Sequence, residues 1–268
     1  MADLASIGVI GGTGLYSFLD STEEISVDTP FGAPSAPLVI GEVAGRRVAF
    51  VPRHGRDHQF PPHRIPYRAN LWALRSVGVR QVLAPSAVGS LTVDYGPGTL
   101  AVPDQLVDRT TGRAQTFYHE GGAVHIQFAD PYCPVGRAYA VAAAQSLGWD
   151  PVSAGTLVII DGPRFSTRAE SRWYAGQGWT LIGMTGHPEA VLARELALCY
   201  TTIALVTDTD AGVDEGEGVT QAEVFRVFSE NIGRLRQVLT KIIEDLPGER
   251  DCPCPHVLDG IKLPFSLP

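Results

Sequence analysis

Two aspartates at the end of an apolar run are the residues best suited to chemistry. Residues 201–206 are apolar or β-branched, which predicts a buried strand, and Asp208 and Asp210 come directly after it. Because side chains alternate along an extended chain, the two carboxyl groups should face the same side. Such a pair can accept hydrogen bonds, bind a cation or hold a proton, although Asp, Thr and Gly are also ordinary strand-ending residues.

A glycine-rich turn follows the first predicted strand. Residues 7–10 are apolar and run into Gly-Gly-Thr-Gly at positions 11–14. Glycines at a strand end let backbone N–H groups turn inward and form an anion cradle, to which the hydroxyl of Thr13 adds a donor. A dinucleotide fingerprint fits less well, because Ser17 stands where its third glycine should be. The Gly-Lys-Ser/Thr of a nucleotide-triphosphatase loop is missing, and a plain tight turn is the structural alternative.

A basic cluster between residues 52 and 64 is unusual in an acidic chain. It holds three histidines and three arginines, among them Arg53, His54, His58 and His63. The planar guanidinium of arginine can donate two parallel hydrogen bonds to phosphate, and such bonds contribute about 1.5–3 kcal/mol each. We therefore expect this segment to form the second half of an oxyanion site. The histidine spacing could suggest a metal, but prolines interrupt any helix and no acidic or cysteine-rich segment is near, so we expect none here.

The composition is that of an ordinary globular protein with a small-molecule ligand. The chain has 268 residues, 44% of them hydrophobic and 19% charged, which is enough for one large domain. The formal net charge of -8 argues against an extended nucleic-acid surface, without excluding a local anion site. The N-terminus has no basic segment before an apolar run, and no apolar stretch approaches roughly 20 residues, so we expect a cytoplasmic protein without membrane contact.

The chain has four cysteines. Cys133 and Cys199 are far apart in sequence and lie in apolar segments, whereas Cys252 and Cys254 flank a proline near the C-terminus. A structural disulfide framework would be unusual in such a chain. A redox or metal role for the C-terminal pair stays open. In the functional site we expect no metal and no cofactor.

Strand-like and helix-like segments alternate along the chain. Strands are predicted at residues 37–43, 47–51, 81–84, 99–102, 105–107, 156–160 and 181–183, with a loop at 85–90. Helices are predicted at 67–77, at 134–147 and between about 190 and 199. Two more helices should begin at capping boxes, one formed by Thr167 and Glu170 and one by Thr220 and Glu223. The alternation predicts an α/β protein with a central mixed, largely parallel twisted sheet flanked by helices. We expect a single domain over residues 1–250, followed by a tail at 251–268.

Several long motifs, in this order, resemble the trimeric purine nucleoside phosphorylases, and within that family the 5′-methylthioadenosine branch. They are Gly-Gly-Thr-Gly-Leu-Tyr at 11–16, Pro-Arg-His-Gly at 52–55, Pro-Pro-His-Arg-Ile-Pro-Tyr-Arg-Ala-Asn at 61–70 and Ser-Ala-Val-Gly-Ser at 86–90. Later landmarks are residues 108–111, 162–170, 183–185 and Pro188-Glu189. The resemblance covers roughly residues 7–246.

The resemblance implies a set of site residues. The phosphate-binding residues would be Thr13, Arg53, His54, Ser86, Ala87 and Thr185, with Ser86 standing where many members have Thr. Phe165 and Ser166 would lie beside the base and Met184 under the ribose. Residues 219–225 would form the pocket for the methylthio group, with Gln221, Val224 and Phe225 as its contacts. His125 matches a histidine that relatives lend to the neighbouring subunit, which implies a homotrimer.

Three of these positions have an ordinary structural alternative or depart from the family. Gln221 stands where an apolar residue is common; it could reach a 5′-hydroxyl and admit adenosine, or point to solvent, which we favour slightly. His125 could be a lone buried histidine. The Gly186-His187 pair differs from the Thr-Val of many relatives, so we expect a different wall of the site there.

The two aspartates then argue for a 6-aminopurine. Adenine offers a ring-nitrogen acceptor and an amino donor, which suit a protonated and a charged carboxyl group respectively. Related enzymes for 6-oxopurines carry Asn in place of the first acid. The expected reaction is phosphorolysis: phosphate, the co-substrate, attacks the anomeric carbon, and Asp208 acts as general acid on the departing purine.

Other classes remain open. A 6-oxopurine phosphorylase acting on methylthioinosine or inosine is the nearest alternative. A nucleosidase that uses water would share the purine pocket. A nicotinamide oxidoreductase would explain the glycine-rich turn but neither the basic cluster nor the two aspartates.

Overall fold

The computed structural model describes residues 3–12, 14–15, 18–213 and 218–268, and a ten-stranded sheet runs through this part of the chain. Its main path follows the order β2-β3-β4-β1-β5-β9-β8-β7, while β10 pairs with β5 and β6. The strands are β1 (Ile7–Gly11), β2 (Asp20–Ile25), β3 (Leu38–Val43), β4 (Arg46–Pro52), β5 (Gln81–Ser90), β6 (Leu100–Ala101), β7 (Gln105–Arg109), β8 (Thr156–Ile160), β9 (Leu181–Gly183) and β10 (Cys199–Thr209).

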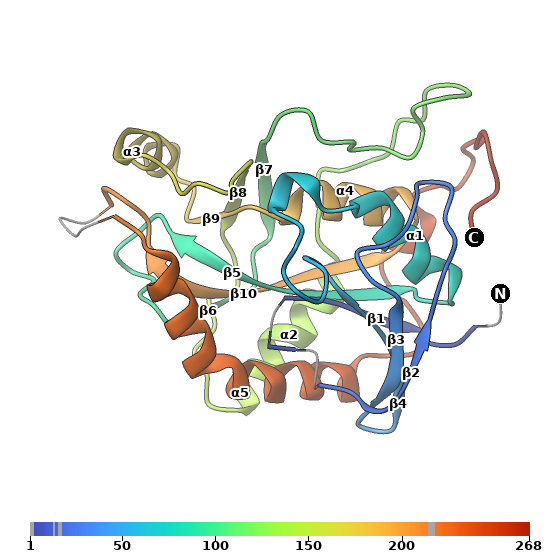
Figure 1. Ribbon diagram of the computed structural model, residues 1–268, viewed down its shortest axis with the longest axis horizontal. Helices are drawn as coiled ribbons and strands as arrows, with labels where there is room; N and C mark the ends of the chain where they lie inside the picture. Colours follow the sequence, from blue (N-terminus) through green and yellow to red (C-terminus); the bar gives the residue numbers. More distant parts are fainter. Residues whose placement is uncertain (1–2, 13, 16–17, 214–217) are drawn as a thin grey trace.

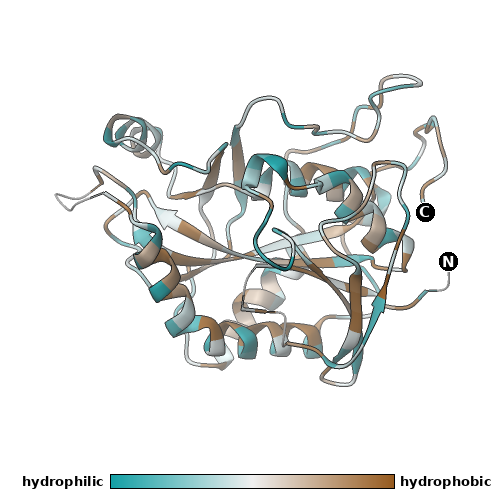
Figure 2. Ribbon diagram, in the orientation of Figure 1, coloured by the Kyte–Doolittle hydropathy of each residue, from teal (hydrophilic) through white to brown (hydrophobic). Residues whose placement is uncertain are grey.

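Helices cover both faces of the sheet (Figure 1). Helices α1 and α4 lie on one side of β10, and α2 and α5 lie on the other, where they pack against each other. The helices are α1 (Tyr67–Ser76), α2 (Pro134–Ser146), α3 (Arg168–Gly176), α4 (Gly186–Glu195) and α5 (Gln221–Asp245), with short 3-10 turns η1 (Pro62–Arg64) and η2 (Cys254–His256). Along α5, hydrophobic and hydrophilic segments alternate in Figure 2, as expected of a helix with one buried face.

The predicted fold class is confirmed. Five strand pairs are parallel, namely β1 with β4 and β5, β10 with β5, and β8 with β7 and β9. The capping box of α3 is present with both of its hydrogen bonds. At α5 the hydroxyl of Thr220 accepts a hydrogen bond from the backbone N–H of Glu223, as expected of the N-cap.

The predicted bounds of two strands are wrong, and a third strand was not predicted. Residues 85–90, expected to be a loop, continue strand β5 to Ser90. Strand β10 begins at Cys199, where a helix was still expected, and includes Asp208. Strand β2 was not predicted, because its sequence Asp-Ser-Thr-Glu-Glu-Ile is polar and nearly all exposed. It is an edge strand held by β3, and charged side chains are common on such edges.

Strand β5 is shared by three neighbours, and this arrangement opens the sheet. Along one edge β10 pairs with it in parallel from Gln81 to Ser90. Along the other edge β1 pairs only with residues 81–83, and β9 only with residues 89–90. Within the described strands, the edge of residues 84–88 between β1 and β9 therefore carries no partner. Pro85 fits there because its missing N–H breaks no ladder hydrogen bond.

The residues after α5 pack against the domain. Cys254 is fully buried, and the ring of Phe265 lies 5.3 Å from that of Tyr118 and 5.7 Å from that of Trp72, measured between ring centroids. None of the helices in the described ranges is long and apolar enough to cross a membrane.

Candidate active site

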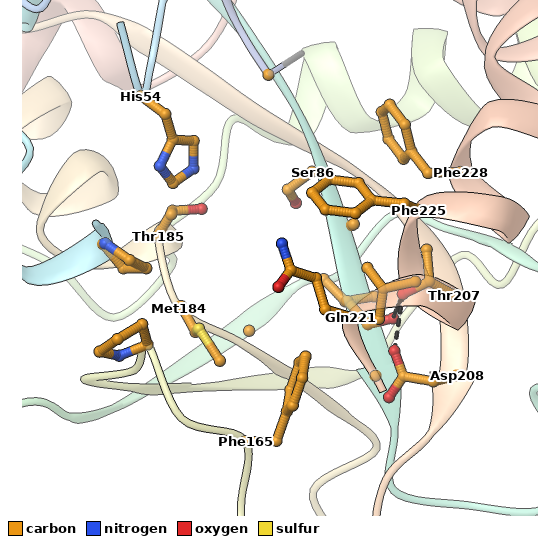
Figure 3. Close-up of a pocket in the computed structure, with 18 of the residues that line it drawn as sticks. His54, Ser86, Phe165, Met184, Thr185, Thr207, Asp208, Gln221, Phe225 and Phe228 are labelled. Carbon is orange, nitrogen blue, oxygen red and sulfur yellow. Dashed lines mark hydrogen bonds between the residues drawn. The ribbon is translucent and has the colours of Figure 1, made fainter. Parts of the chain in front are cut away.

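A cavity of about 860 Å³ lies along the open edge of β5 (Figure 3). Its size is within the range of roughly 300–1,000 Å³ that is usual for small-molecule sites. Thirteen of the predicted site residues line it: Arg53, His54, Ser86, Ala87, Phe165, Ser166, Met184, Thr185, Asp208, Asp210, Gln221, Val224 and Phe225. Thr13 lies outside the described residues. The fold thus brings six separate segments of the sequence together around one cavity.

One end of the cavity carries neutral hydrogen-bonding groups suited to an oxyanion. His54, Ser86 and Thr185 lie towards this end in Figure 3. The carbonyl of Pro85 points to the open edge of β5, where Arg53 donates to it, and because backbone groups alternate along a strand those of Ala87 point to the same edge. Ser86 lines the cavity with its side chain. Thr185 is the N-cap of α4 but makes no capping hydrogen bond with its side chain, and a helix N-terminus favours negative charge.

His54 is held as a neutral ring. Burial is the main cause that lowers its pKa to about 4. Its Nδ1 lies 2.8 Å from the carbonyl oxygen of Phe60, and because a carbonyl only accepts, Nδ1 carries the proton. The other ring nitrogen is then an acceptor, which suits a protonated phosphate oxygen or a ribose hydroxyl. The ring stacks on His58 at 4.3 Å, whereas His63 is on the surface.

Arg53 is oriented by a buried ion pair rather than left open to an anion. Its Nε and Nη2 donate to the two carboxylate oxygens of Glu189 at 2.5 and 3.1 Å. Nη1 donates to the carbonyl of Pro85 and Nη2 to that of Ile10, both at 3.0 Å. Since a guanidinium has five N–H groups, these contacts with described residues leave one N–H of Nη1 for an anion. The bidentate geometry expected for phosphate is thus used for Glu189.

The opposite end of the cavity carries the two aspartates. Asp208 and Asp210 are 5% and 3% exposed. Burial is the main cause that raises the pKa of Asp208 to about 6; the hydrogen bond from Thr207 at 2.7 Å opposes the shift, and Asp210 adds to it. Burial also raises the pKa of Asp210, against the hydrogen bond that the hydroxyl of Ser171 donates to its Oδ2 at 2.6 Å. The pair can therefore hold a proton near neutral pH, as a general acid must.

A bulge in β10 and a glycine in β5 set the position of the acids. The register of β10 against β5 shifts between Val206 and Asp208, and such bulges re-aim a side chain. A Cβ on Gly89 would lie 2.8 Å from Oδ2 of Asp208 and 3.6 Å from Cβ of Asp210. Asp208 thus approaches the strand at a point where only glycine leaves room, as does Ile182, whose Cγ2 would lie 2.9 Å from the same Cβ, whereas the distance to Asp210 is an ordinary contact.

Between the two ends lie the residues predicted to contact the base and the sugar. Phe165 and Met184 line the middle of the cavity, and the ring of Phe165 faces it in Figure 3. The backbone here is tied down by Arg113, whose Nη1 donates to the carbonyl of Met184 at 2.8 Å and whose Nη2 donates to that of Asp161 at 3.0 Å.

The first turns of α5 close the cavity with a mixed surface. Val224 and Phe225 supply apolar contacts, and Phe225 is 47% exposed. The amide of Gln221 points into the cavity (Figure 3), while the residue is also exposed to solvent, so both orientations weighed from the sequence are compatible with its position. This polar group lies where a purely apolar pocket was expected from the resemblance.

Two other sequence predictions concern residues away from the cavity. His125 is exposed and is not among the lining residues, so the alternative of a buried histidine is wrong. His187 is buried, with Nε2 at 3.0 Å from Gln115 and 3.2 Å from Asp108, and it does not line the cavity either.

The sequence did not reveal the residues that hold the site residues in position. Glu189 was noted only as part of a motif, yet it orients Arg53 and accepts a hydrogen bond from the hydroxyl of Tyr200 at 2.9 Å. Arg113 and Gly89 were given no role. The position of Glu189 directly before the apolar run 190–193 was a usable signal, because a buried carboxylate requires a partner.

Comparison with known proteins agrees with this geometry. The family model of the phosphorylase superfamily matches residues 6–244, and the chain belongs to this family. It is 61% identical to a purine nucleoside phosphorylase of Streptomyces coelicolor over 98% of each chain. It is 56% identical to an S-methyl-5′-thioadenosine phosphorylase of Mycolicibacterium smegmatis, which spans 98% of this chain and 99% of the relative.

Solved structures show the same fold. A methylthioadenosine phosphorylase from an Antarctic soil metagenomic library superposes with a TM-score of 0.88 at 37% identity, covering 96% of this chain and 92% of that one. A methylthioadenosine phosphorylase of Schistosoma mansoni in complex with adenine gives 0.84 at 36% identity, covering 89% and 91%. The resemblance to the methylthioadenosine branch is therefore confirmed.

Replacing Gly89 with Ala is expected to reduce nucleoside phosphorolysis by about 10²-fold, because a Cβ there displaces the carboxyl group of Asp208 and misplacement of about 1 Å can cost that much. The measurement is kcat/KM at saturating phosphate. Gly96→Ala is the matched control, since a Cβ at that position meets nothing within 4 Å. Wild-type turnover in Gly89→Ala would show that the close approach of Gly89 and Asp208 is unimportant.

Proposed function

We propose that this protein catalyses the phosphorolysis of S-methyl-5′-thioadenosine to adenine and 5-methylthioribose 1-phosphate, as a pentosyltransferase. The observation that carries the proposal is the pairing of a proton-holding carboxyl, Asp208, with an oxyanion-binding end in one cavity. Family membership and the names of the relatives support it.

The chemistry follows from the two ends of the cavity. Phosphate held near His54, Ser86, Ala87 and Thr185, with Thr13 as a further donor, attacks the anomeric carbon from the side opposite the base. Bond breaking runs ahead of attack and gives a ribosyl cation, as in glycoside cleavage, and the phosphate stabilises its positive charge. Asp208 gives its proton to the departing ring nitrogen, so that adenine leaves as a neutral molecule.

The acids also select the base. A protonated Asp208 donates to the ring nitrogen, and a charged carboxylate accepts from the 6-amino group. A 6-oxopurine presents a carbonyl there, which a carboxylate repels. A site built for one hydrogen-bonding pattern can reject the other by as much as about 10⁴–10⁵.

Further features of the proposal concern the protein's setting. The reaction serves purine and methionine salvage in the cytoplasm and requires no cofactor besides the co-substrate phosphate. We propose a homotrimer in which the exposed His125 of one subunit completes the 5′ pocket of its neighbour, since in a single chain His125 does not line the cavity.

A four-substrate panel tests the proposal. Methylthioadenosine, adenosine, methylthioinosine and inosine are each incubated with and without phosphate, and release of the free base is measured. We expect adenine from methylthioadenosine only when phosphate is present. Faster cleavage of inosine or methylthioinosine would favour the 6-oxopurine alternative, and cleavage without phosphate would identify a nucleosidase.

Asp208→Asn is expected to lower kcat/KM for methylthioadenosine by about 10²-fold or more, because an amide cannot donate the catalytic proton. In the wild type the protonated acid is the active form, so kcat/KM should fall as pH rises through about 6. The variant should lose this limb of the profile. The measurement is a pH series at saturating phosphate, with the exposed Asp150→Asn as control.

The same variant should be more stable at high pH. Burial raises the Asp208 pKa from 3.8 to about 6, so its favourable contribution is full below 3.8 and lost as pH rises through 6. Above that pH the buried charge costs up to about 3 kcal/mol. The Tm gain of Asp208→Asn should therefore be larger at pH 8 than at pH 5. Equal gains at both would contradict a buried, proton-holding Asp208.

Adenosine is a second candidate substrate, favoured by the amide of Gln221 inside the cavity. The similarity to a purine nucleoside phosphorylase is consistent with it. Gln221→Leu is expected to raise the ratio of kcat/KM for methylthioadenosine to that for adenosine by about tenfold, which is the value of one hydrogen bond. Gln237→Leu, on an exposed position of the same helix, is the matched control. An unchanged ratio would show that Gln221 does not contact the 5′ group.

A further inference from the structure

Four cysteines meet at the end of the molecule away from the two aspartates. The sulfur atoms of Cys133, Cys199, Cys252 and Cys254 all lie within 4.8 Å of one another, and all four carry free thiols. Three of the side chains are buried and Cys252 is half-buried. The proposed function uses none of them.

The four thiols come from three separate elements. Cys133 is the N-cap of α2, and Cys199 is the first residue of β10. Cys252 and Cys254 belong to the segment after α5, and the sulfur of Cys252 lies 3.4 Å from that of Cys199. Segments that are 53 and more residues apart thus converge through their sulfur atoms.

The arrangement has the dimensions of a tetrathiolate metal site. Zinc binds thiolate sulfur at about 2.3 Å, which places the four sulfurs of a regular tetrahedron about 3.8 Å apart. The observed cluster needs only small side-chain movements to reach that geometry. Four sulfur ligands in a closed site are typical of structural zinc and leave no position for a substrate.

The surroundings can also support sulfur in its anionic form. The backbone N–H of Gly136 donates to the sulfur of Cys133 at 3.4 Å. The guanidinium of Arg250 lies 3.9 Å from the sulfur of Cys199 and is fixed by hydrogen bonds to the carbonyls of Ala197 and Arg80, at 2.9 and 3.3 Å. Hydrogen-bond donors of this kind orient the ligands of a metal and offset their negative charge.

We propose that Cys133, Cys199, Cys252 and Cys254 bind one Zn²⁺ ion as a structural site. On binding, the four thiols give up four protons and the site carries two negative charges, with no change in oxidation state. The ion ties the C-terminal segment to the start of β10 and to α2. The sequence left a redox or metal role open for Cys252 and Cys254 alone and did not predict that Cys133 and Cys199 join them.

The ion takes no part in the reaction. Asp208 lies nine positions after Cys199 in β10, which corresponds to roughly 30 Å along an extended strand. Metal loss should therefore affect the stability of the fold and leave the chemistry of the cavity intact.

The first experiment measures metal in the full chain without any substitution. The protein is purified with a reductant and without a metal-affinity tag, equilibrated with Zn²⁺ and dialysed. Elemental analysis should find one zinc per chain. Replacing Zn²⁺ by Co²⁺ should give the intense visible and sulfur-to-metal bands of tetrahedral thiolate coordination, which report the ligands directly.

The second experiment uses matched variants. The double variant Cys252→Ser, Cys254→Ser should lose the bound equivalent of zinc. His256→Ala, which removes the imidazole two residues after Cys254 in the same 3-10 turn but no proposed ligand, should retain it. A strong chelator should lower the Tm of the wild type but not that of the double variant. Turnover of the double variant at moderate temperature should equal that of the wild type.

Two results would overturn the proposal. The first concerns zinc content: either the reduced wild type retains no zinc after dialysis, or the double variant still retains it. The second concerns oxidation: protein kept under reductant has an intact mass that is lower than that of the reduced chain by four hydrogens, which shows two disulfide bonds. If the double variant does not fold, the cobalt spectrum of the wild type alone decides, because spectra without sulfur coordination would exclude the site.

Discussion

The site depends on one constraint in the sheet: β5 has to pair with β1 at its start and with β9 at its end, and neither covers residues 84–88. A continuous sheet would bury this stretch of backbone under another strand. Because it is left open, Arg53 can donate to the carbonyl of Pro85, and Ser86 and Ala87 can face the cavity. Strand β10 keeps the open segment straight by pairing with it along its whole length.

The distribution of charge across the cavity follows from how each ionisable group is satisfied. Arg53 and Glu189 neutralise one another in the interior, at 3% and 1% exposure, so neither presents a full charge to the cavity. Removing one partner of such a pair leaves the other buried and unpaired, which typically costs several kcal/mol. The aspartates have no arginine or lysine among their hydrogen-bond partners in the described part of the chain, so burial shifts their pKa values upward. One end therefore offers directed hydrogen bonds without a full positive charge, and the other can hold a proton.

Features that depend on neighbouring residues in the sequence could be predicted. Residues 7–10 and 156–160 are strands because they are short apolar runs, and Thr167 caps α3 because its partner Glu170 is three residues away. The placement of the two aspartates on one side was correct in outcome, since both line the cavity. The simple alternation that predicted it was incomplete, because a bulge precedes Asp208.

Features that depend on distant partners could not be predicted. Residues 85–90 contain Pro, Ser and two small residues, which favour a loop, but pairing with β10 extends them into a strand. The engagement of Arg53 with Glu189, 136 residues away, is invisible to local patterns. The same holds for Gln221, whose orientation depends on where the first turn of α5 docks, and for the four cysteines, which are brought together only by the completed fold.

The two ends of β10 connect stability to chemistry. A slip of one residue between β10 and β5 would turn every side chain of β10 to the opposite face and remove Asp208 from the cavity. The central part of the strand gives little protection against such a slip, since residues 203–206 are apolar on both faces and fully buried. Register must therefore be fixed at the ends: by the bulge and the fit against Gly89 at one, and by Cys199 at the other. The proposed ion, bound to Cys199 together with α2 and the C-terminal segment, would hold the strand at its first residue and so stabilise the fold, while the bulge and Gly89 are sufficient to position Asp208.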